Sequence, residues 1–143
     1  LELAREYKGR HDVKLGRGGL VEVLFLVQLL QLQFGRTHHA LRTPNTVEAL
    51  TQLRTNGLLA AEAHETLISA YRFLRRLESG LRLIHDRSLN EFREEAEELQ
   101  ELTRHLYRGE VPAGEGTERL LQEFLRQTEA VRELYCHFFQ TAE

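Results

Sequence analysis

The feature that most constrains the fold is the segment 20–34, which is apolar on nearly every side of the helix that it predicts. Its apolar residues recur at spacings of three and four: Leu20, Val23, Leu24, Val27, Leu30 and Phe34, with Phe25, Leu26 and Leu29 widening the stripe. A helix with so little polar surface belongs at the centre of a bundle. We therefore expect a buried helix from Gly18 to Phe34.

A charged, glycine-rich elbow, residues 12–19, leads directly into this helix. A glycine costs a helix or strand about 0.5–1 kcal/mol relative to alanine, so three glycines within four residues need a reason. Either the backbone turns sharply as it joins the bundle, or it lies close to a partner such as a phosphate. Backbone amides at a helix N-terminus, with Lys14 and Arg17 beside them, suit an anion. Physical chemistry alone favours the turn.

The elbow matches neither of the common phosphate-binding loops. Val21 stands where a dinucleotide fingerprint needs its third glycine, and residues 1–7 look helical where that motif needs a strand. A P-loop ends in Gly-Lys-Ser or Gly-Lys-Thr, and the chain contains neither.

Composition limits the class of protein. The 143 residues are 41% hydrophobic and 29% charged, which predicts one globular domain. A net charge of −3 provides no general attraction for nucleic acid or anionic membranes, and no apolar run reaches the ~20 residues of a membrane span. The single cysteine, Cys136, excludes an internal disulfide and favours a cytoplasmic location. Because the chain starts without methionine and contains none, we expect a fragment of a longer protein.

Helix-forming residues dominate the whole chain, and we expect an all-α fold without strands. The predicted fold is an antiparallel up-and-down bundle of four long helices plus one or two short ones, with 1–17 as a leading segment and 18–142 as the bundle. After the first helix we expect helices over 46–57, 60–85, 90–107 and from 117 onward, with a loop over 109–116. Asn45 and Glu48 predict a capping box, Gly57 a C-cap, Thr117 an N-cap and Gly80 a close helix contact.

Two charged helix faces are candidate surfaces. One carries Arg72, Arg75, Arg76 and Arg82. The other carries Glu91, Glu94, Glu95, Glu97, Glu98 and Glu101. We expect the glutamates to be solvated. The arginines either pair with them or bind an acidic protein or a phosphate.

The sequence lacks the spacings of residues that catalysis and metal binding require. The only aspartates, Asp12 and Asp86, are far apart in the sequence, whereas nucleotidyl transfer needs clustered carboxylates to hold divalent ions. His64 and Glu65 begin like a zinc-protease helix, but Ile68 occupies the position of the second ligand. Nothing positions a base beside Cys136. We expect no catalytic residue, no metal site and no cofactor in this chain.

The segment 12–20, followed by Phe25-Leu26-Val27-Gln28, resembles the glutamine synthetase adenylyltransferase family and, more distantly, the PII uridylyltransferases. Further matching segments follow in the same order: Gln31-Leu32, Leu41-Arg42, Asn45-Thr46 with Ala49-Leu50, Gly57-Leu58-Leu59, 70–78, 81–83 and Asp86-Arg87. The resemblance covers about residues 12–106 by discrete motifs and the last helix by pattern only.

This resemblance implies a helical domain that follows a nucleotidyltransferase domain, so that the chain is expected to be a C-terminal fragment of a larger enzyme. The parent enzymes use ATP and magnesium to adenylylate glutamine synthetase in one half, and they remove the adenylyl group in the other half. Segments 19–22 and 42–50 look like the adenylylating half. Matching positions expected to face the catalytic domain and its nucleotide are Lys14, Gly16, Gly18, Gly19, Glu22 and Gln28. Glutamine synthetase and the preceding domain are the expected partners, and the alternative is a stand-alone module that binds a PII-type signal protein.

The chain departs from the family pattern at two positions. Leu24 stands where the family usually has glutamate, and Val21 where it often has arginine. The loss of charge at the start of the central helix indicates an altered domain interface or a degenerate copy with weakened activity.

Overall fold

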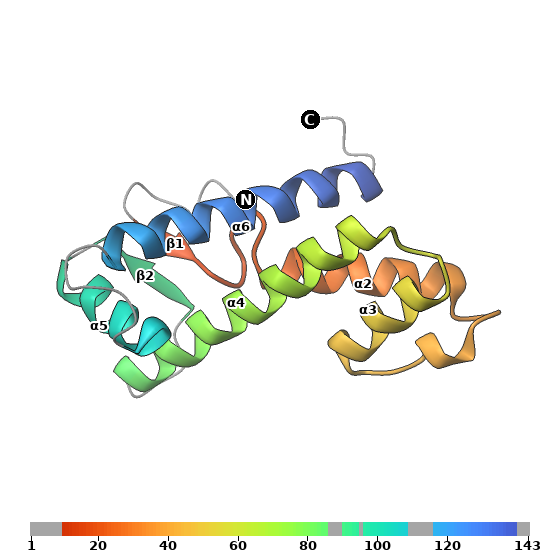
Figure 1. Ribbon diagram of the computed structural model, residues 1–143, viewed down its shortest axis with the longest axis horizontal. Coiled ribbons are helices and arrows are strands. Elements are labelled where there is room, and N and C mark those ends of the chain that lie inside the picture. The colour runs from red at the N-terminus through yellow and green to blue at the C-terminus, as the bar shows by residue number, and fades with distance from the viewer. Residues whose placement is uncertain (1–9, 86–89, 95, 109–115, 140–143) are drawn as a thin grey trace.

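The computed structural model describes residues 10–85, 90–94, 96–108 and 116–139 (Figure 1). In chain order, its elements are β1 (Arg10–Asp12), α2 (Leu20–Phe34), the 3₁₀ helix η1 (His39–Leu41), α3 (Thr46–Thr55), α4 (Ala61–His85), β2 (Glu91–Arg93), α5 (Ala96–Tyr107) and α6 (Gly116–Phe139). The all-α class is confirmed. The expectations for the segments 1–7 and 109–115 and for Asp86 lie outside the described residues.

The long helices α4 and α6 lie side by side and form the spine of the domain (Figure 1). They are antiparallel, because Leu67 near the start of α4 shares a core with Val131 in the second half of α6, whereas Leu81 near the end of α4 shares one with Leu120. At about 1.5 Å per residue, 25 residues give α4 a length of about 37 Å. This spine spans both halves of the core.

The core has two halves, one toward each end of the spine. In the first, α2, η1 and α3 pack on the start of α4 and the end of α6. In the second, β2 and α5 pack on the end of α4 and the start of α6, together with Val13 and Leu20. The helices α2 and α5 therefore occupy opposite ends of the spine, and the four long helices do not all run side by side.

Local capping follows the sequence closely at α3. The Asn45 side chain accepts a hydrogen bond of 2.9 Å from the backbone amide of Glu48, as a capping residue does. Gly57 has φ of +71°, and its amide donates to the carbonyl of Arg54. The capping role of Asn45 and the C-cap at Gly57 are confirmed. The other half of the capping box is wrong, because the amide of Asn45 donates to the hydroxyl of Thr43 and the carboxylate of Glu48 accepts from the side chain of Gln52. The N-cap prediction for Thr117 is wrong, because α6 begins one residue earlier and includes Thr117.

The expectation that the chain has no strand, and that a helix starts at residue 90, is wrong. β1 and β2 form an antiparallel pair in which His11 lies opposite Phe92, and the amide of Val13 extends the pair by donating to the carbonyl of Asn90 at 2.7 Å. Phe92 is fully buried, and its ring packs edge-on against Phe124 at 5.2 Å. Strand pairing and burial of this aromatic ring override the helical propensity of the surrounding glutamates.

Candidate functional site

The elbow folds as a closed turn in which backbone amides already have acceptors inside the chain. The carboxylate of Asp12 accepts hydrogen bonds from the amides of Lys14 and Leu15, at 3.0 and 2.7 Å. The amide of Leu20 donates to the carbonyl of Val13, and that of Val21 to the carbonyl of Lys14. These contacts fix the direction in which the chain enters α2.

Two elbow glycines are required by close packing. Gly18 has φ of +70°, and a Cβ there would lie 1.8 Å from the carbonyl oxygen of Thr128 on α6. A Cβ on Gly19 would lie 2.7 Å from the carbonyl oxygen of Val13. Only glycine fits at both positions, so the sharp turn into the bundle accounts for them.

Glu22 connects the elbow, the start of α2 and α6. The residue is 5% exposed, and its carboxylate accepts a hydrogen bond of 2.9 Å from the amide of Gly18. The other carboxylate oxygen lies 2.6 Å from the guanidinium of Arg132. A negative charge in the first turn of a helix is favoured by the helix dipole. The chain's own carboxylate therefore occupies the start of α2.

The six predicted nucleotide or domain-interface residues fall into two groups. Gly16, Gly18, Gly19 and Glu22 are buried, whereas Lys14 and Gln28 are exposed. The structure brings the first four together inside the turn and leaves Lys14 and Gln28 accessible to another molecule. Their role toward a nucleotide or a catalytic domain stays a prediction.

One face of α2 is apolar and exposed. Phe25 is 48% exposed and Leu32 is 84% exposed, so the expectation that Phe25 joins the buried stripe is wrong. Val21, Phe25, Gln28 and Leu32 follow one another at spacings of four, three and four residues, which places them on one side of the helix. This second stripe is the signal in the sequence for an exposed apolar face. It is hard to recognise, because α2 is apolar on nearly every side. Leu24 is half-buried.

Of the two alternatives for the arginines of α4, pairing with the glutamates of 91–101 is not found among the described residues. Arg72, Arg75, Arg76 and Arg82 are exposed on α4. Arg75 pairs with Glu78 of its own helix at 2.9 Å, and Arg76 donates to the carbonyl of Leu106 at the end of α5.

The acidic segment finds histidine partners instead. Glu94 lies 2.6 Å from the ring of His11, and Glu98 lies 2.6 Å from the ring of His85. The Glu98 side chain is 16% exposed, so the prediction of a fully solvated glutamate face is wrong at this residue. Its second oxygen accepts a hydrogen bond from the amide of Arg93, at 2.7 Å, which ties β2 to α5.

A polar cluster joins α5 and α6 beside these arginines. Burial and the carboxylate of Glu123 raise the pKa of Tyr107, against the lowering effect of Arg119 and Arg76. Burial acts to raise the pKa of Glu123. Hydrogen bonds from Arg126 and Gln127, together with the positive charges of Arg126 and Arg119, outweigh it and hold that pKa below its ordinary value. The guanidinium of Arg119 lies over the ring of Tyr107 at 5.4 Å. Arg76 of α4 and Arg119 of α6 therefore both act on Tyr107 at this end of the domain.

The described residues contain no group of three His, Cys, Asp or Glu side chains that could hold a metal ion. Among the helices in the described ranges, none is long and apolar enough to cross a membrane.

Comparison with known proteins identifies the family. A family model described as GlnD PII-uridylyltransferase matches residues 2–139. The chain therefore belongs to the family of PII uridylyltransferases and glutamine synthetase adenylyltransferases, as its motifs indicate.

Individual relatives narrow this class. The bifunctional glutamine synthetase adenylyltransferase/adenylyl-removing enzyme of Mesorhizobium japonicum is 35% identical over 132 residues, which are 92% of this chain and 13% of the relative. The enzyme of the same description from Bradyrhizobium diazoefficiens is 32% identical over 130 residues, 91% of this chain and 12% of the relative. That from Corynebacterium diphtheriae is 50% identical over 72 residues, 50% of this chain and 7% of the relative. The chain thus matches only a small part of the length of each of these relatives.

Proposed function

We propose that this chain is the helical accessory domain of a bifunctional glutamine synthetase adenylyltransferase/adenylyl-removing enzyme, in its adenylylating half. In this role it holds glutamine synthetase, in the cytoplasm, against a nucleotidyltransferase domain that precedes it. The observation that carries the proposal is the exposed apolar face of α2, with Phe25 at 48% and Leu32 at 84% exposure, next to the exposed Lys14 of the elbow. Relatives that are themselves bifunctional glutamine synthetase adenylyltransferase/adenylyl-removing enzymes support the assignment to an enzyme of this kind.

The α2 face has the properties of a docking surface. Moving a leucine or phenylalanine side chain from water into a packed interface is favourable by about 1.5–3 kcal/mol when the side chain becomes fully buried. The buried face of α2 already fills the core of the bundle, so the exposed face is available to a second domain. We assign ATP and magnesium to that second domain, since the described part of this chain supplies no cluster of ligands for a metal ion.

The docking test uses the nucleotidyltransferase domain of a full-length relative as the titrant. We expect the chain to bind it, and we expect Phe25→Asp with Leu32→Asp to abolish binding measured by calorimetry. Leu83→Asp is the matched control, because Leu83 is a 66% exposed leucine on α4. Equal loss of binding in the control, or none in the double variant, would overturn the assignment of this face.

The activity test asks whether the chain transfers an adenylyl group. Incubated with glutamine synthetase, ATP and magnesium, the chain is expected to give no adenylylation above background. In the whole enzyme, Lys14→Ala is expected to lower turnover and to leave the melting temperature unchanged, because the Lys14 side chain is exposed. A matching loss of stability would instead make the elbow purely structural.

A second candidate is a module that binds a PII-type signal protein through α4. The exposed guanidinium groups of Arg72, Arg75 and Arg82 favour it, because they present positive charge along one helix. Arg72→Glu with Arg75→Glu tests this reading, and an unchanged affinity for the PII protein would exclude it.

A further inference from the structure

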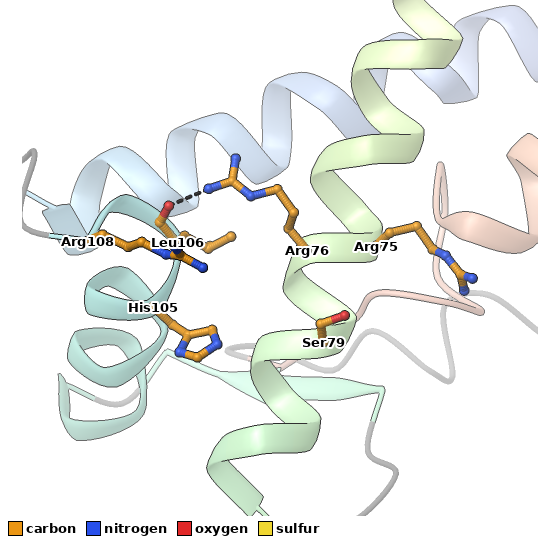
Figure 2. Close-up of a pocket in the computed structure, with 6 residues that line it drawn as sticks. All are labelled: Arg75, Arg76, Ser79, His105, Leu106 and Arg108. Carbon is orange, nitrogen blue, oxygen red and sulfur yellow. Dashed lines mark hydrogen bonds between the residues drawn. The ribbon is translucent and has the colours of Figure 1, made fainter. Parts of the chain in front are cut away.

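A cavity of about 470 Å³ lies between α4 and the end of α5 (Figure 2). It is lined by Arg75, Arg76, Ser79, His105, Leu106 and Arg108. Its volume falls within the range of small-molecule sites, about 300–1,000 Å³. The exposed face of α2 lies on a different element, so this cavity is separate from the surface assigned to domain docking.

The cavity is positively charged. Figure 2 shows Arg76, from α4, and His105 and Arg108, from the end of α5, beside the space between the two helices. The guanidinium of Arg75 points away from that space and pairs with Glu78. In the described ranges, no carboxylate lies within ion-pair distance of the side chain of Arg76, His105 or Arg108. Two guanidinium groups and one imidazole therefore converge without a counter-ion from the described part of the chain.

Two contacts hold this arrangement in place. Arg76 donates to the carbonyl of Leu106, which fixes its guanidinium at the cavity wall and offsets the negative end of the α5 dipole. α4 and α5 pack against each other at Gly80, where an added Cβ would lie 3.3 Å from the side chain of Leu102 and 3.5 Å from the ring of His105. The guanidinium of Arg76 is thus positioned before any ligand arrives, which reduces the entropy lost on binding.

Arg108 has an unusual backbone conformation. Its φ is +46°, the left-handed region that a non-glycine residue rarely adopts, and its amide donates to the carbonyl of Arg104 at 2.9 Å. Glycine is the usual residue at such a helix end. The chain places a guanidinium there instead, at the edge of the cavity.

We propose that this cavity binds the phosphoryl group of a small soluble ligand, either orthophosphate or the phosphate of a nucleotide. A guanidinium offers a planar fork of donors that matches phosphate oxygens, and an imidazole N–H adds a further donor. The convergence of Arg76, His105 and Arg108 on one space is complementary to a doubly charged, tetrahedral anion. A neutral ligand would leave these charges unmatched.

The test titrates the chain with orthophosphate, pyrophosphate and AMP at low ionic strength, by calorimetry and by amide chemical shifts. We expect binding of at least one of them, with shifts at Arg76 and His105. Arg108→Gly removes the guanidinium and suits the left-handed backbone, and Arg76→Gln removes the second. Each is expected to weaken binding on the order of tenfold or more, the loss of one charged hydrogen bond.

Arg82→Gln is the matched control, since Arg82 is exposed on α4 and does not line the cavity. It is expected to keep the wild-type affinity.

Binding of orthophosphate identifies the free anion as sufficient, and binding of AMP alone identifies a nucleotide phosphate. The absence of binding by all three probes, up to a concentration of about 10 mM, would overturn the proposal. Equal affinity in Arg108→Gly and the wild type would do the same. Because the assay uses neither glutamine synthetase nor a catalytic domain, its result is independent of the function proposed above.

Discussion

The carboxylate of Glu22 and the guanidinium of Arg132 lie 2.6 Å apart and join α2 to α6, with side chains only 6% and 19% exposed. A pair shielded from water keeps most of its electrostatic attraction, and each charge becomes costly when the other is removed. Because Glu22 also accepts from the amide of Gly18, the same carboxylate fixes the glycine turn. The pair therefore couples the elbow to the spine of the domain.

Removal of either partner should strongly destabilise the chain. We expect Glu22→Ala and Arg132→Ala each to cost about 3 kcal/mol of unfolding free energy, measured by urea denaturation. The control is Arg126→Ala, because Arg126 is 67% exposed and pairs with Glu123 three residues earlier on α6. Exposed pairs of this type contribute about 0–1 kcal/mol. Similar losses for the two arginines would show that burial does not strengthen the Glu22 pair.

Substitutions at the two glycines with a left-handed backbone distinguish the cost of backbone strain from the cost of a steric clash. Gly18 and Gly57 have nearly equal φ, +70° and +71°, but a Cβ on Gly57 meets nothing within 4 Å. Gly57→Ala should cost about 1–2 kcal/mol, the strain of the left-handed backbone. Gly18→Ala should cost clearly more, because the new Cβ collides with the backbone of Thr128. Thermal denaturation of both variants checks this, and equal losses would contradict the packing of the elbow on α6.

Sequence periodicity predicted the parts of the fold that depend on local rules. The capping of α3 by Asn45, the C-cap at Gly57 and the amphipathic stripe of α4 depend on residues three or four positions apart. The pairing of β1 with β2 does not, because His11 and Phe92 are 81 positions apart in the chain and neither segment has a strong strand pattern. Tertiary burial of Phe92 decides that region.

In the candidate sites, too, features that depend on neighbouring residues are visible in the sequence, whereas contacts between distant segments are not. The elbow was visible as a cluster of glycines, but its ion-pair partner, Arg132, lies on the last helix and has no sequence signal. The sequence pattern gives no signal for His105 and Arg108, since the packing of α5 against α4 brings them to Arg76. Contacts between distant helices are set by packing, which a single sequence does not reveal.

Glu98 should control the stability of the short sheet. Glu98→Ala removes the acceptor for the amide of Arg93 and the partner of His85, so we expect a loss of about 1–2 kcal/mol and faster amide exchange at Arg93. Glu101→Ala is the control, because Glu101 is exposed on the same helix, and it should change neither quantity. Unchanged exchange at Arg93 in the Glu98 variant would show that the strand pair holds β2 by itself.

His64 should make the domain sensitive to acid. The residue is 9% exposed, and in the described part of the chain neither ring nitrogen has a hydrogen-bond partner. Burial lowers the pKa of His64 below 6.5, and the positive charges of Arg54 and Arg72 add to this effect against the opposing Glu65. The unfolded chain therefore binds a proton at a higher pH than the folded chain does. The contribution of neutral His64 to stability is complete above about pH 6.5 and falls as the pH drops toward the folded-state pKa.

His64→Leu removes both the titration and the two unsatisfied nitrogens. At pH 8 the variant should be at least as stable as the wild type, because a buried polar atom without a partner costs free energy and leucine has none. As the pH falls from 7 to 5, the melting temperature of the wild type should decrease more steeply than that of the variant, and the gap between them should widen. Melting curves of both proteins across this range measure the gap. A constant difference would mean that His64 protonates as readily in the folded chain as in the unfolded one, which its burial beside two arginines argues against.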